Sequence, residues 1–229
     1  MKNLLLGTAA SLLSLAPVVP PTGRLQAAEL KVLAGGSMTG VLNELGPQFE
    51  RASDHRLVIH FDSTPNLIKQ ATSEPFDLGI VPVDLFKDAA AKARFGPTIN
   101  IARAGYGLAV RAGHIPPASA AGAYVSGVFE RLGIGEAMKA KTKVQTATTE
   151  IPKAVARGDA ELGVFLVNVL MAPGVELAGS FPAELQQELV FTAAVAVDTQ
   201  QADAAKAFIH FLTTPAAIAV IKARGMSPG

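Results

Sequence analysis

The chain lacks cysteine and tryptophan and carries few charges, and each of these features excludes a class of function. Without cysteine the chain cannot form a disulfide, a thiolate nucleophile or a cysteine-ligated metal site. Charged residues make up 17% of the sequence, the formal net charge is +1, and no basic stripe is present. We therefore expect no nucleic-acid partner. Only 6% of the residues are aromatic, so platforms on which bases could stack are also scarce.

Hydrophobic residues make up 49% of the 229 residues, which indicates a globular chain with one large domain or two small lobes. The first 28 residues have the pattern of a secretory signal peptide: Lys2, an uncharged apolar run over 4–16, then proline and small residues. The run is shorter than the roughly 20 residues that span a membrane. Removing residues 1–28 takes away Lys2 and Arg24, which lowers the formal net charge from +1 to −1. We predict a soluble exported protein.

The mature N-terminal half alternates between strand and helix patterns. Apolar runs predict strands at 30–36, 56–62 and 76–82, with helices from residue 38 onward and over 63–74. Gly46 and Pro47 should kink or break the first helix. The β-α-β-α-β order with short connections is typical of a parallel, doubly wound sheet.

The second half has weaker but similar patterns. Residues 99–113 are apolar and punctuated by glycine, which predicts an extended segment that carries the chain from one lobe to the other. A helix is expected over 119–134 and strands near 162–167 and 189–198. The C-terminal residues predict one or two helices, broken near Thr213 to Pro215.

Two of the predicted strand-to-helix corners carry the same small polar residues. Gly36 and Ser37 follow the first strand, and Ser63 and Thr64 follow the second. Parallel strands place both corners at one edge of the sheet, where helix N-termini offer backbone N–H groups and a partial positive charge. Two such corners facing one point make an anion site without lysine or arginine. Serine and threonine are also the preferred N-caps of any helix, so a purely structural role stays open.

Other chemistry has less support. A serine nucleophile elbow needs G-x-S-x-G, and here Gly35 and Ser37 fit while Thr39 stands in place of the second glycine. The patterns at His60 and His210 favour structural roles, so a hydrolase that uses Ser37 is kept only as an alternative. There is no P-loop, dinucleotide motif or metal-ligand spacing. We therefore expect no cofactor and no metal.

Several segments resemble one family in order along the chain. The opening LKVLAGGSMTGVLNELGPQFER resembles that of the periplasmic molybdate-binding proteins of ABC transporters. VIHFDSTPNLIKQ resembles the family's second serine-rich turn, and FDLGIVPVD its third strand end. ARGDAELGVFLVNVL, GVELAGSFPAEL and AAKAFIHFLTTPAAIAVIKARGM resemble the C-terminal half. The resemblance covers nearly the whole mature chain.

The resemblance implies an α/β, type II periplasmic binding protein fold with two lobes, each a doubly wound, mostly parallel sheet flanked by helices. It places lobe I at 29–104 and 195–229 and lobe II at 105–194, with a hinge through Ile101–Val110 and the strand near Val195. Such a protein is a monomer without enzymatic activity. It closes on a small oxyanion of the molybdate or tungstate type and docks on an ABC permease in the membrane.

The resemblance also assigns site residues by position. Ser37, beside Gly36, matches the first-turn serine, and Thr64, beside Ser63, matches the second-turn hydroxyl. The family's backbone contacts from the second lobe fall at about Ala121 and Thr148 in this chain.

Two positions depart from the family pattern. Leu166 stands where the family often has a tyrosine donor, and Asp62 stands where a small neutral residue is expected. These departures leave the ligand open between a molybdate-like oxyanion and a different small polar molecule. A sensing role in place of transport also stays open.

Overall fold

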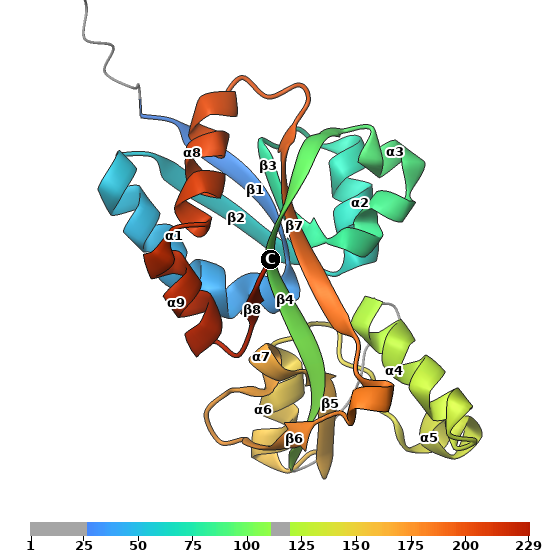
Figure 1. The fold of residues 1–229 in the computed structure, drawn as a ribbon. Helices are drawn as coiled ribbons and strands as arrows, with labels where there is room; N and C mark the ends of the chain where they lie inside the picture. Colours follow the sequence, from blue (N-terminus) through green and yellow to red (C-terminus); the bar gives the residue numbers. More distant parts are fainter. Residues whose placement is uncertain (1–26, 111–119) are drawn as a thin grey trace, which may run out of the picture.

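A computed structural model describes residues 27–110 and 120–229 (Figure 1). All of the predicted signal peptide except Ala27 and Ala28 lies outside the described residues. The strands are β1 (Glu29–Gly35), β2 (Arg56–Asp62), β3 (Leu78–Pro82), β4 (Phe95–Val110), β5 (Leu162–Leu166), β6 (Glu176–Ser180), β7 (Glu188–Ala196) and β8 (Ser227–Pro228). The helices are α1 (Thr39–Ser53), α2 (Thr64–Ser73), α3 (Ala89–Lys92), α4 (Ala120–Arg131), α5 (Gly135–Lys141), α6 (Glu150–Arg157), α7 (Val167–Leu170), α8 (Ala202–Leu212) and α9 (Pro215–Ala223). Short 3-10 turns lie at η1 (Gly36–Met38), η2 (Val83–Lys87) and η3 (Ala183–Leu185).

The first lobe is a sheet between two layers of helices (Figure 1). Strands β2, β1 and β3 pair in parallel, and β7 and then β4 continue the sheet in antiparallel fashion. Alternate residues of β1 face opposite layers: Leu30 and Val32 pack into the core with α1 and α8, and Leu33 packs into the core with α2. This alternation explains why the strand reads as a continuous apolar run.

The long strands β4 and β7 connect the lobes. β4 pairs with β7 as far as Gly105, and from Tyr106 onward it pairs with β5, with β6 joining on its other side. Both of these second-lobe pairs are antiparallel to β4, so parallel pairing in the described sheet is confined to the first lobe. The two-lobe α/β architecture is as expected, and the lobe boundaries given above stay a prediction.

The strands and helices that the sequence predicts lie close to their expected positions, with one correction at α1. Gly46 and Pro47 do not break this helix, which runs from Thr39 to Ser53. Proline cannot donate to the carbonyl four residues earlier. Pro47 and Asn43 both lie on the exposed face, where water can hydrate that carbonyl, while Val41, Leu45 and Phe49 hold the opposite face in the core.

The C-terminal helices α8 and α9 meet at Thr213 and Thr214, as the sequence predicts, and bend by 62°. Within the described residues no single helix is long and apolar enough to cross a membrane. The two helices of this bent pair together have the length and apolar composition of a membrane span. Phe208, Leu212 and Ile221 of the pair are buried in the core of the first lobe.

The side chain of Gln186 completes the ladder where β7 begins. Its Oε1 accepts a hydrogen bond from the Tyr106 N–H at 2.8 Å, and its Nε2 donates to the Tyr106 carbonyl at 3.0 Å. The amide thus takes the place of a strand residue beside β4 at the point where the chain passes between the lobes. Gly105 has no side chain there, and a Cβ would lie 3.2 Å from the Gln186 amide carbon.

We expect Gln186→Ala to lower the free energy of unfolding by about 1–3 kcal/mol, because it leaves the N–H group of the buried Tyr106 without its partner. The Tyr106 carbonyl loses the bond from Gln186 but keeps the one from the Phe181 N–H. Urea denaturation measures the change. Gln187→Ala is the matched control, because Gln187 is exposed, and it should change the midpoint little. Equal midpoints for the two variants would contradict the role given to Gln186.

Candidate ligand-binding site

The corner after β1 presents a buried serine that does not cap a helix. Ser37 lies in η1 and is 8% exposed. The N-cap of α1 is Met38, and within the described residues no side chain caps η1 or α1. The Thr39 hydroxyl donates to the Gly36 carbonyl at 2.7 Å, which holds the turn. The purely structural role as a cap therefore does not apply to Ser37.

The corner after β2 is built around an aspartate. Ser63 is the N-cap residue of α2, but its side chain makes no capping hydrogen bond. Instead Asp62 Oδ1 accepts from the Ser63 N–H at 2.7 Å and from Asn66 Nδ2 at 2.9 Å. Asp62 thus uses one of the N–H groups that the sequence assigned to an anion. The hydroxyl groups of Ser63 and Thr64 make no helix cap.

Asp62 carries its negative charge close to this corner. Burial raises the pKa of its carboxyl group, but hydrogen bonds from Asn66, the Ser63 N–H and His60 outweigh burial and lower the pKa below the ordinary value of 3.8. The carboxylate is therefore ionised at neutral pH. A second negative charge brought to this corner is repelled, and the repulsion grows with the charge of the ligand.

Because the pKa of Asp62 is lowered on folding, the ionised group stabilises the fold above pH 3.8, and this contribution is lost as the pH falls further. We expect Asp62→Asn to be less stable than the parent chain at pH 7. The difference should narrow as the pH falls below 3.8. Denaturant unfolding of both proteins at pH 7 and at a pH below 3.8 measures the difference in stability. A difference that is independent of pH would contradict the lowered pKa of Asp62.

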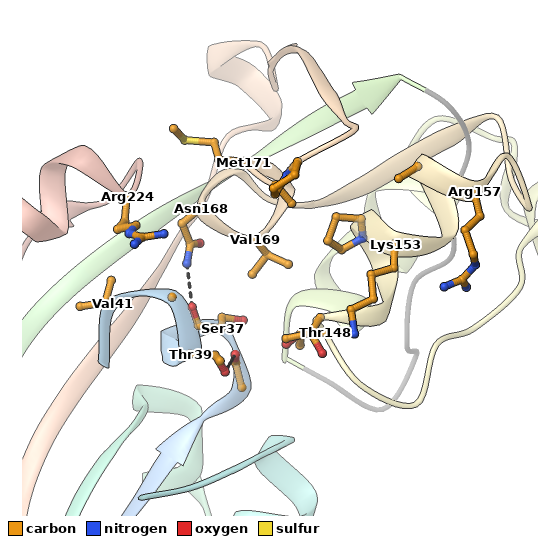
Figure 2. A pocket seen from close by; sticks show the side chains of 17 residues that line it. Ser37, Thr39, Val41, Thr148, Lys153, Arg157, Asn168, Val169, Met171 and Arg224 are labelled. Atoms are coloured by element: carbon orange, nitrogen blue, oxygen red, sulfur yellow. Dashed lines mark hydrogen bonds between the residues drawn. The ribbon is translucent and has the colours of Figure 1, made fainter. Parts of the chain in front are cut away.

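The second lobe reaches the first at Thr148, shortly before α6. A Cβ at Gly36 would lie 3.0 Å from the Thr148 hydroxyl oxygen and 3.6 Å from the Asp62 carbonyl oxygen. The missing side chain of Gly36 therefore makes room for Thr148. A second contact between the lobes lies nearby, where Asn168 Nδ2 donates to the Ser37 carbonyl at 2.7 Å (Figure 2).

Five of the six residues predicted for the site line one small cavity of about 20 Å³: Gly36, Ser37, Ser63, Thr64 and Thr148. Its apolar wall includes Phe165, Leu189 and Phe191. Ala121 is the second residue of α4, and its surroundings lie outside what the structure describes. We call this space the inner cavity. The role of these residues in binding stays a prediction.

A larger space of about 550 Å³ opens from the same point, and we call it the outer groove (Figure 2). It shares Gly36, Ser37 and Thr148 with the inner cavity. The start of α1 forms one side, and α6 and α7 form the other. Figure 2 shows Lys153 and Arg157 on one side of the groove and Arg224 on the other.

The profile of one protein family, bacterial extracellular solute-binding proteins, matches residues 30–118 and 114–227. The chain belongs to this family. Among curated relatives, an aconitate isomerase of a Pseudomonas species is 25% identical over 87% of each chain. The molybdate-binding protein ModA of Azotobacter vinelandii is 24% identical over 87% of this chain and 90% of its own.

The solved structure of the A. vinelandii periplasmic molybdate-binding protein has the same fold, with a TM-score of 0.75. It is 20% identical, and the match covers 87% of this chain and 99% of the other. The resemblance to periplasmic molybdate-binding proteins drawn from the sequence is confirmed.

In this solute-binding protein, Leu166 stands where the family often has a tyrosine donor. Leu166 is fully buried at the end of β5, opposite Tyr106 of β4, and it provides no donor. Asn168, two residues later, does provide one, and it donates to the first lobe. No pattern in the sequence indicated Asn168, because its partner lies 131 residues away.

His55 and His60 contact groups other than Ser37. His55 Nδ1 accepts from the Ala28 N–H at 3.1 Å, and His60 Nε2 lies 2.7 Å from Gln70 Nε2 and 3.5 Å from Asp62 Oδ2. Within residues 27–110 and 120–229, no group of three potential metal ligands comes together. The site is thus built from hydroxyl groups, backbone amides and, in the outer groove, cations.

Proposed function

We propose that the chain is the solute-binding component of an ABC transporter and captures a small oxyanion group between its lobes. The group is either an inorganic oxyanion of the molybdate or tungstate type or the acidic group of a small organic ligand. One observation carries the proposal: neutral donors from both lobes, among them Ser37 and Thr148, surround one cavity. Hydroxyl and amide donors at helix N-termini are a recurrent solution for binding anions.

Lobe closure would be part of capture. A cavity of about 20 Å³ has room for about one water molecule, so an oxyanion enters only when the lobes separate. β4 and β7 are the strands that pass between the lobes, and bending there would open the contact between Gly36 and Thr148. A ligand held by Ser37 on one side and Thr148 on the other would then favour the closed form.

The proposal includes where the protein acts and which partner receives its ligand. The predicted signal peptide and the membership of an extracellular family support a periplasmic, monomeric receptor that delivers its ligand to a membrane permease. The closed form would be the one that the permease recognises. The receptor itself would carry out no reaction.

Thermal denaturation of residues 27–229 with molybdate, tungstate, sulfate, phosphate and small carboxylates tests binding. A ligand present at 100 times its dissociation constant stabilises the folded state by about 2.7 kcal/mol and raises the melting temperature. Ser37→Ala should reduce the shift, whereas Ser126→Ala, an exposed serine on α4, should leave it unchanged. The proposal fails if none of these anions raises the melting temperature.

An enzyme that acts on an organic acid in the same cleft is the second candidate. The similarity to an aconitate isomerase over 87% of both chains favours it. Proton NMR of cis- and trans-aconitate incubated with the protein separates the two functions. Interconversion that Ser37→Ala abolishes would support an enzyme, and unchanged spectra together with a thermal shift would support a receptor.

A further inference from the structure

The outer groove is much larger than an inorganic oxyanion needs. Its volume of about 550 Å³ lies within the roughly 300–1,000 Å³ of typical small-molecule sites, whereas the inner cavity measures about 20 Å³. The two spaces meet at Gly36, Ser37 and Thr148. A ligand whose acidic group occupies the inner donors would therefore have space for an organic body beside them.

The walls of the groove suit a short aliphatic body. Apolar side chains from both lobes line it: Val41, Pro152, Ala156, Val169, Met171, Ala172 and Pro173. None of the described lining residues is aromatic. Nucleobases are commonly held by stacking on aromatic rings, so this lining does not favour them.

Three cations border the groove from two directions (Figure 2). Lys153 and Arg157 project from α6, and Arg224 follows α9. Each pairs with an acid outside the groove lining, as in the contact of 2.7 Å between Lys153 and Glu150. Exposed pairs of this kind contribute little to stability, about 0–1 kcal/mol.

These cations retain donors for a ligand. A lysine has three N–H donors and an arginine five, more than the recorded pairs use. Arg224 binds Glu44 through Nε and Nη2, and its Nη1 lies 4.0 Å from the Cβ position of Gly40 at the start of α1. The groove therefore presents positive charge at a distance from the neutral donors of the inner cavity.

Asp62 makes a doubly charged head group less favourable than a singly charged one. It borders the inner cavity, and its carboxylate is ionised at neutral pH. A carboxylate group brings one negative charge to this corner, and a fully ionised tetrahedral oxyanion of the molybdate type brings two. The repulsion at equal distance is about half as large for the carboxylate.

We propose that the physiological ligand is a small aliphatic acid with two or three carboxylate groups. One carboxylate binds the neutral donors at Ser37 and Thr148, the carbon chain lies along the apolar wall, and the other carboxylates reach the cations at Lys153 and Arg157. The proposal deepens the function proposed above and rests on it, because the first carboxylate uses the same inner donors.

Isothermal titration calorimetry with propane-1,2,3-tricarboxylate, citrate, propionate, molybdate and sulfate tests the ligand class. We expect the two tricarboxylates to bind more tightly than propionate and the inorganic anions. In the double variant Lys153→Gln, Arg157→Gln, tricarboxylate affinity should fall on the order of tenfold or more, because charged hydrogen bonds are lost. Lys206→Gln on α8, outside the groove lining, is the matched control and should bind like the parent chain.

The possible outcomes separate this inference from the function on which it rests. Binding of molybdate or sulfate alone, weakened by Ser37→Ala, would overturn the polycarboxylate ligand and leave the receptor function standing. Tricarboxylate binding that is equal in the double variant and the parent chain would overturn the placement in the groove. Binding of none of the five probes would count against both proposals.

Discussion

Replacing Gly36 with valine should abolish anion binding by the chain while leaving both lobes folded. A Cβ at this position already lies 3.0 Å from the Thr148 hydroxyl, and the two methyl groups of valine extend further into the contact between the lobes. The lobes could then no longer bring Ser37 and Thr148 to the same ligand. Losing hydrogen bonds worth about 1.5–3 kcal/mol each to a charged group weakens binding by roughly 100-fold or more.

Calorimetric titration with the anion that gives the largest thermal shift measures the loss. Gly127→Val in α4 is the matched control, since a Cβ at Gly127 has no atom within 4 Å. The chain has no tryptophan that could report on folding, so circular dichroism is used to compare the folds of the two variants. Parent-like affinity in Gly36→Val would mean that the ligand does not lie between Gly36 and Thr148.

Replacing Phe191 with alanine should produce the largest loss of stability among the residues around the inner cavity. Phe191 is fully buried in β7, where it pairs with Pro82 of β3 and Ala102 of β4. Its ring lies 3.1 Å from the Cβ position of Gly35 and forms part of the inner cavity wall. Truncating a buried phenylalanine costs about 3–5 kcal/mol, because packing is lost and a cavity remains.

Thermal unfolding should show a melting temperature roughly 10 °C lower for Phe191→Ala, given about 2–4 °C per kcal/mol for a chain of this size. Phe191→Leu keeps most of the side-chain volume and should recover most of the stability. A loss below about 1 kcal/mol for the alanine variant would show that Phe191 does not support the two strands as described.

The fold was predictable because its elements are local in sequence. Strand β2 at Arg56–Asp62 and the break between α8 and α9 were expected at these positions, since strand residues and turn residues mark them directly. The exception at Pro47 arose because a proline on the solvated face of a helix need not end it, since water can hydrate the carbonyl that loses its partner. The elements β6 and β8 carry few strand-forming residues and were not expected.

The candidate site was only partly predictable. Ser37 and Thr64 could be found because they follow strands, and Thr148 because the family resemblance placed it. Arg224 and Asn168 could not, since they reach the groove from elements far from α1 in the sequence. Lys153 could not be found either, because only the folded chain brings α6 beside the anion donors.

The most direct test of the account is a crystal structure of residues 27–229 grown with the anion that gives the largest thermal shift. We predict an acidic group of that anion within hydrogen-bonding distance of both Ser37 and Thr148, with the two lobes closed around it. An anion that contacts one lobe only, or that lies away from the corners after β1 and β2, would contradict the account.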